Sequence, residues 1–136
     1  MSLFRILSAT LLMALLAACA GPGPLRRMEA RLVEVESVAA EPVESFHFWS
    51  LHSWEPLGRR HLLVHTRINE GWLLQVDEPC PGLEFAINIG LSSSNNRVYQ
   101  RFDTVNFEQQ RCRIAEIRPV DVKALRALRR EKAPEA

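Results

Sequence analysis

Apolar and polar residues alternate with a period of two over much of residues 45–117. Phe46 and Phe48 alternate with His47 and Trp49, and two β-rich runs at residues 61–66 and 72–76 flank a polar segment that ends in Gly71. Alternation of this kind is typical of strands, and the paired runs predict a hairpin.

Further short runs continue this pattern at residues 83–91, 98–99, 102–107 and 112–117. The alternation in residues 83–91 predicts a strand with one apolar face, formed by Phe85, Ile87, Ile89 and Leu91. About six strands at short spacing predict an all-β fold, namely a single small antiparallel sandwich or barrel-like domain.

The segments that flank this region show helical spacing. At the C-terminal end, Asp121 is positioned to cap a short helix whose inward stripe is Val122, Leu125 and Leu128. At the N-terminal end, residues 25–35 carry apolar side chains at helical spacing, yet the alternation of Val33 and Val35 with glutamates fits a strand equally well. Helix and strand remain open for this segment.

The N-terminus has the pattern of a secretory signal. Arg5 is the only charged residue before an uncharged, Leu- and Ala-rich stretch at residues 6–18. A membrane-spanning helix needs about 20 such residues, so this stretch is too short to span a bilayer. Its end, Leu16-Ala17-Ala18-Cys19, closely resembles the lipobox of bacterial lipoproteins.

This resemblance implies that residues 1–18 are removed and that Cys19 is acylated, which anchors the chain in a membrane. Several acyl chains on one residue anchor a protein stably, whereas a single chain does not. The alternative is a plain secretory signal with an incidental cysteine. Ala20 stands where some enterobacterial lipoproteins carry an Asp that retains them in the inner membrane. We therefore expect the periplasmic face of the outer membrane in preference to the inner membrane.

The chain then divides into four parts. Residues 1–18 are the signal peptide and residues 19–44 the lipid anchor and linker, which opens with a Gly- and Pro-rich spacer. Residues 45–132 form the β-rich domain with its terminal helix, and residues 133–136 are a tail. Removal of the signal takes away one arginine and leaves equal numbers of basic and acidic residues. A chain without net charge gives no indication of a nucleic-acid partner.

Cysteine usage fits an oxidising compartment. With Cys19 acylated, Cys80 and Cys112 are the remaining thiols, and such a pair predicts a disulfide. Closing a loop of about 30 residues stabilises the folded chain by about 3–4 kcal/mol in the chain-entropy model.

A family resemblance rests on residues around these two cysteines. The order Trp72-Leu-Leu-Gln-Val, Cys80-Pro-Gly-Leu and Arg111-Cys-Arg-Ile resembles a family of small proteobacterial lipoproteins catalogued only as a domain of unknown function. The likeness covers about residues 43–121. It implies a lipoprotein signal, a compact domain and a cysteine pair, and it implies no activity, cofactor or catalytic residue.

All four histidines, His47, His52, His61 and His65, fall within one short segment. His61 and His65 share one face of a predicted strand, where side chains four positions apart lie too far apart to bind one metal ion easily. We therefore predict surface or hydrogen-bonded histidines, with no metal site, no cofactor and no catalytic residue. The alternative is a small envelope hydrolase or metal-binding protein that uses residues 47–65.

Two further groups of side chains are candidates for binding. Trp49, Trp54 and Trp72 can stack on sugars or peptide side chains, or else Trp49 and Trp72 lie in the core with Trp54 at its edge. We expect Trp54 to be the most exposed of the three. Basic residues gather on the predicted C-terminal helix, where they either bind anionic lipid or form a solvated face that complements the helix dipole. They are Lys123, Arg126, Arg129 and Arg130.

The sequence therefore predicts a lipid-anchored module of the cell envelope that binds a partner and is not an enzyme. The partners expected are the membrane, through the anchor, and either another envelope protein or a cell-wall glycan. Lipid anchoring raises the local concentration of such a module, so its intrinsic affinity need not be high.

Overall fold

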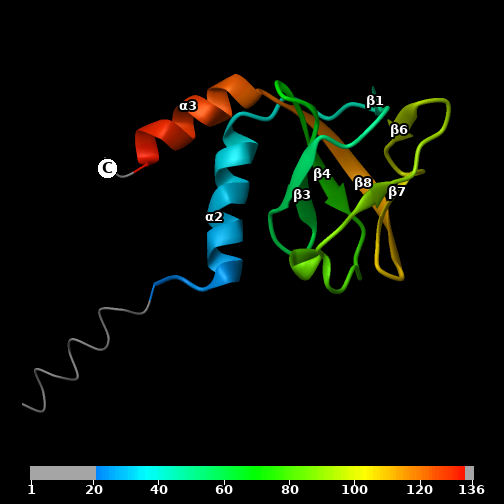
Figure 1. The fold of residues 1–136 in the computed structure, drawn as a ribbon, viewed down its shortest axis with the longest axis horizontal. Coiled ribbons are helices and arrows are strands. Elements are labelled where there is room, and N and C mark those ends of the chain that lie inside the picture. The colour runs from blue at the N-terminus through cyan, green and yellow to red at the C-terminus, as the bar shows by residue number, and fades with distance from the viewer. Residues whose placement is uncertain (1–20, 134–136) are drawn as a thin grey trace, which may run out of the picture.

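The computed structural model describes residues 21–133 (Figure 1). The predicted signal peptide and the predicted acylation site Cys19 lie outside these residues, as do residues 134–136 of the predicted tail. In chain order the elements are α2 (Pro24–Ser37), β1 (Ser45–His47), β2 (Ser53–Pro56), β3 (His61–Arg67), β4 (Glu70–Val76), the 3-10 helix η1 (Leu83–Phe85), β5 (Gly90–Leu91), β6 (Arg97–Tyr99), β7 (Thr104–Phe107), β8 (Gln110–Val120) and α3 (Val122–Lys132).

Six of the strands form one antiparallel sheet in the order β2-β3-β4-β8-β7-β5. The sheet curls into a half-barrel, and β1 and β6 form a separate two-stranded ribbon. The predicted all-β fold is therefore correct only in part. The fold is mixed: a mostly antiparallel half-barrel with one helix before it and one after it.

Around β3 and β4 the curved sheet is buried on both faces. On β3, Leu62 and Val64 point into the half-barrel, where they pack with Phe46 and Val98 of the ribbon. Leu63 points the other way, into a second core that lies under the two helices. Successive side chains of a strand point to opposite faces, so a run of three buried residues is the expected pattern for a strand covered on both sides.

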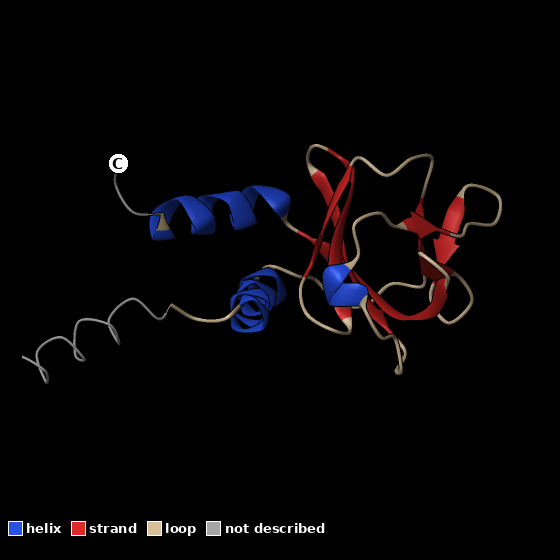
Figure 2. Cartoon of the chain, turned by 60° about the horizontal axis from the view of Figure 1, so that its bottom comes forward, coloured by secondary structure: helices blue, strands red, loops and turns tan. Residues whose placement is uncertain are grey.

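α2 covers part of the face of the sheet that lies opposite the inside of the half-barrel (Figures 1 and 2). It begins with Pro24 in its first turn, where the missing N–H of proline costs nothing. Val35 is fully buried against the sheet, whereas Val33 is 65% exposed. The helical alternative for this segment is thus correct, and the segment that we assigned to the linker holds a helix packed on the domain.

α3 provides the other part, as predicted. The Asp121 carboxylate accepts a hydrogen bond from the backbone N–H of Ala124 at 3.0 Å, which caps the helix N-terminus. Val122 and Leu125 are buried. None of the helices in residues 21–133 is long and apolar enough to cross a membrane.

The strands agree with the sequence pattern except at residues 83–91. The predicted hairpin forms from β3 and β4, with β8 on its other side. The predicted strand over residues 83–91 is wrong for most of its length, because η1 replaces its start and only Gly90–Leu91 is a strand. Gly82, with φ of 89°, turns the chain into η1. As a result Phe85 and Ile87 are 74% and 81% exposed instead of packing on one buried face.

Candidate functional site

The four histidines lie at three separate places in the fold. His47 lies on β1, with its Nε2 atom 2.8 Å from Nη1 of Arg97. His52 and His65 are neighbours, because the backbone N–H of His52 donates to the carbonyl oxygen of His65 at 2.8 Å. His61 lies at the start of β3. Residues 21–133 contain no group of three or more His, Cys, Asp or Glu side chains that could hold a metal ion.

His52 and His65 border a polar pocket of about 180 Å³ between α3 and the β2–β3 side of the sheet. Burial lowers the pKa of His65 below its usual 6.5, the nearby Glu55 carboxylate raises it, and the Arg126 guanidinium lowers it again. At neutral pH the ring is therefore uncharged, and the positive charge of this pocket comes from Arg126 and Arg129. Burial lowers the pKa of His61 as well.

Two of the four basic residues predicted as a binding surface are engaged within the molecule. The guanidinium of Arg129 lies 2.6 Å from Oε1 of Glu55 and 3.4 Å from Oε2 of Glu34. Arg126 donates to Oδ1 of Asn69 at 2.7 Å and also to the carbonyl oxygen of Ile68. These contacts fasten α3 to α2 and to the sheet.

The other two, Lys123 and Arg130, are exposed and form no ion pair among the described residues. The predicted basic surface is therefore divided between contacts that hold the helix in place and two cations that face solvent.

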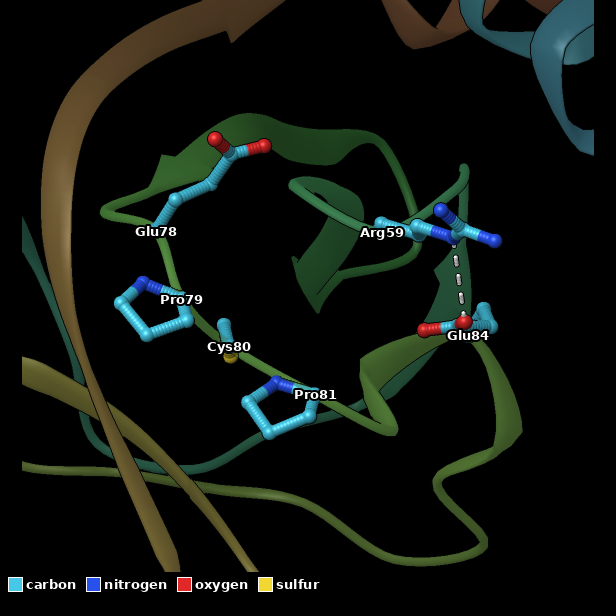
Figure 3. A pocket seen from close by; sticks show the side chains of 6 residues that line it. All are labelled: Arg59, Glu78, Pro79, Cys80, Pro81 and Glu84. Carbon is cyan, nitrogen blue, oxygen red and sulfur yellow. Dashed lines mark ion pairs between the residues drawn. The ribbon is translucent and has the colours of Figure 1, made fainter.

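The predicted disulfide is confirmed. Cys80 and Cys112 are bonded, so neither sulfur is a free thiol. Beside the bond lies a cleft of about 360 Å³ (Figure 3). Figure 3 shows Pro79 and Pro81 on one side of the cleft and the Arg59–Glu84 pair on another, with Nε and Oε1 3.5 Å apart. The cleft is thus lined by two prolines and by an ion pair in which Oε1 of Glu84 faces Arg59, while Oε2 of Glu84 is buried without a hydrogen-bond partner.

The tryptophans are arranged differently from the prediction. Trp72 is partly buried, stacks on Phe46 with ring centroids 4.8 Å apart, and donates from Nε1 to Oγ1 of Thr66. Trp54, which we expected to be the most exposed, lies on β2 and packs partly against the core. Trp49, one of the two expected in the core, is 75% exposed.

The outward side of β1 and β6, together with the loop residue Trp49, forms a surface that we call the ribbon face. Phe46 and Val98 are paired across the ribbon and both point inward. The neighbouring pairs, Ser45 with Tyr99 and His47 with Arg97, therefore point outward. The ribbon face consists of Ser45, His47, Trp49, Arg97 and Tyr99.

Arg97 is held in position at the centre of this face. Its Nε and Nη2 atoms donate to Oγ of Ser45 at 3.1 and 2.8 Å, and its Nη1 contacts His47. Such contacts reduce the freedom of a long side chain before any partner arrives. The face thus combines a fixed guanidinium with a large exposed aromatic ring.

Comparison with known proteins places the whole chain in one family. The model of a family of unknown function, DUF6491, matches residues 2–136. The chain belongs to DUF6491. Membership of a family of unknown function was expected from residues 43–121, and the DUF6491 match extends over nearly the whole chain, including the residues around Cys19. No curated protein and no solved structure matches the chain.

In this DUF6491 chain the ribbon face escaped prediction, although its signal was present. The alternation of Phe46 and Phe48 with His47 and Trp49 already puts the tryptophan on the side of the histidine and away from the phenylalanines. Size and apolarity suggested a core position for Trp49, and the period of two indicated the opposite. Nothing in the local sequence indicated Arg97, because it comes from a strand 50 residues further along the chain.

Proposed function

We propose that this DUF6491 chain is a lipid-anchored, non-catalytic binding module of the bacterial cell envelope, and that it binds its partner through the ribbon face. The lipobox-like sequence before Cys19 supports the anchor. The Cys80–Cys112 disulfide supports an oxidising compartment outside the cytoplasm.

The observation that carries the binding role is the exposure of Trp49, two positions after His47, together with the pre-positioned Arg97 that pairs with His47 across the ribbon. An exposed tryptophan gains free energy by covering its apolar face, and aromatic rings and arginine are enriched where binding energy is concentrated. Arg97 already has its Nε and Nη2 atoms engaged by Ser45, so a partner does not have to immobilise it.

Of the two partner classes expected from the sequence, a cell-wall glycan fits this face better. A sugar ring offers an apolar side that stacks on indole, and its hydroxyl groups hydrogen-bond to side chains such as Tyr99 and His47. Carboxylates attached to the polymer pair with the guanidinium of Arg97. Each group of the ribbon face then has a counterpart.

The position of the ribbon suits a tethered module. In Figures 1 and 2 the β1–β6 ribbon lies on the side of the sheet away from α2 and α3. α2 is the described element closest in sequence to Cys19. A chain anchored before α2 therefore leaves the ribbon face accessible.

Co-sedimentation of the acylated chain with purified cell-wall sacculi in detergent tests this function. We expect Trp49→Ala and Arg97→Ala each to weaken binding by about tenfold, which corresponds to ~1.4 kcal/mol. Phe102→Ala is the matched control, since Phe102 is 71% exposed and lies outside the ribbon face. Equal sedimentation of all variants, or specific photo-crosslinking of position 49 to another envelope protein instead of glycan, would contradict glycan binding by this face.

A further inference from the structure

The segment formed by η1 and the loop that leads to β5 presents two large apolar side chains to solvent. Phe85 is 74% exposed and Ile87 is 81% exposed. The loop itself is held down, because Leu83 is fully buried and Ala86 and Ile89 pack against the core of the half-barrel. Phe85 and Ile87 are therefore presented on a fixed backbone, and exposed apolar groups of this kind mark interaction sites.

This loop lies beside the first turns of α2. Phe85 borders a hollow of about 170 Å³ together with Pro24, Leu25 and Met28. The Arg59–Glu84 ion pair completes its lining. Figure 1 shows η1 at the level of the lower end of α2. We call the apolar residues at this hollow, together with the exposed Ile87 two positions after Phe85, the anchor-side patch: Pro24, Leu25, Met28, Phe85 and Ile87.

The position of the predicted acylation site indicates what covers this patch. Cys19 precedes Pro24 by five positions, a distance that an extended chain spans with at most about 17 Å. Acyl chains on Cys19 would therefore hold the start of α2 at the surface of the bilayer. This step rests on the lipid anchor of the proposed function.

The charges at this end of the molecule are complementary to a membrane surface. Arg26 and Arg27 lie in the first turn of α2, are exposed, and form no ion pair within the described part of the chain. Glu29 is the one acidic residue between Pro24 and Arg31. Basic side chains next to apolar ones bind anionic headgroups, each by about 1 kcal/mol near the surface.

We infer that Phe85 and Ile87 insert into the interface of an anionic lipid bilayer, the same bilayer that holds the acyl chains of Cys19. The lipid anchor supplies proximity, and the anchor-side patch fixes the orientation of the domain. In that orientation the ribbon face points away from the membrane.

Photo-crosslinking to lipid tests this inference. The acylated full-length chain carries a photoreactive benzoylphenylalanine in place of Phe85 or, as the matched control, in place of Phe102. Each protein is reconstituted into vesicles of phosphatidylethanolamine and phosphatidylglycerol, floated on a density gradient, irradiated and analysed by mass spectrometry. We expect lipid adducts at position 85 and on the order of fivefold fewer at position 102.

The outcomes separate the anchor from the orientation. Flotation without preferential lipid adducts at position 85, or adducts that join two protein chains there, overturns the inference and leaves the anchor intact. Failure to float overturns both.

A second pair of variants checks the charge contribution. Arg26→Glu with Arg27→Glu should lower the adduct yield several-fold, whereas Lys123→Glu with Arg130→Glu on α3 should leave it unchanged. Equal loss in both pairs would overturn the assignment of this end of the molecule to the membrane.

Discussion

Gly71 lies where the first residue of α3 packs closely on the β3–β4 hairpin. A Cβ atom at this position would lie 2.9 Å from Cγ2 of Val122 and 3.4 Å from the ring of His65. We expect Gly71→Ala to push α3 outward and lower the free energy of unfolding by about 1–3 kcal/mol, the usual cost of overpacking. Urea unfolding measures it. Gly90→Ala is the control, because nothing lies within 4 Å of its Cβ position, and equal effects at the two sites would refute the close contact.

His65 makes the stability of the domain depend on pH. Because burial lowers its pKa in the folded state, the unfolded chain binds more protons between the folded pKa and 6.5. Stability therefore increases with pH in this window and is lost as the pH falls through 6.5. We expect the melting temperature to decrease as the pH is lowered from 7.5 to 5.5. In the His65→Gln variant this decrease should be smaller.

Burial also lowers the pKa of His61, so His61 accounts for the slope that remains in the His65→Gln variant. A wild-type slope in the His65→Gln variant would contradict the role of His65.

At the scale of elements, the disulfide joins the segment before η1 to β8. The bonded cysteines are 32 positions apart and both are buried. For a loop of this size, removal of the bond is expected to lower the free energy of unfolding by about 3–4 kcal/mol. Cys80→Ser with Cys112→Ser, compared with the oxidised wild-type chain by urea unfolding, measures it. A loss under 1 kcal/mol would show that packing alone holds η1 in place.

Elements with two independent local signals were predictable from the sequence. The β3–β4 hairpin combines period-two runs with a glycine beside the turn, and α3 combines a capping aspartate with an apolar stripe. The sequence does not decide between helix and strand for α2, because Val33 and Val35 fit both. Only the tertiary contact that buries Val35 under the sheet decides between them.

The strand predicted at residues 83–91 fails for a different reason. Period-two alternation indicates a strand only where the apolar side chains pack in a core. Phe85 and Ile87 are exposed instead. Trp49 differs, because there the alternation with Phe46 and Phe48 indicates the outward side, and only the size and apolarity of the residue suggest the core.

At the scale of the whole molecule, the fold separates two surfaces. The helices cover one side of the curved sheet. The anchor-side patch includes the start of α2, which is the end of that helix nearer to Cys19 in the sequence. The ribbon lies on the other side, with its aromatic and polar residues exposed. Such a layout suits a module that rests on a membrane and binds a partner away from it.

Mass spectrometry of the N-terminal peptide of the protein purified from bacterial membranes tests this layout most directly, since the lipid anchor underlies it. We expect the mature chain to begin at Cys19 with acyl chains on that residue, and a Cys19→Ser variant to be released from the membrane fraction. A chain that retains residues 1–18, or one that begins at an unmodified residue, would contradict lipid anchoring.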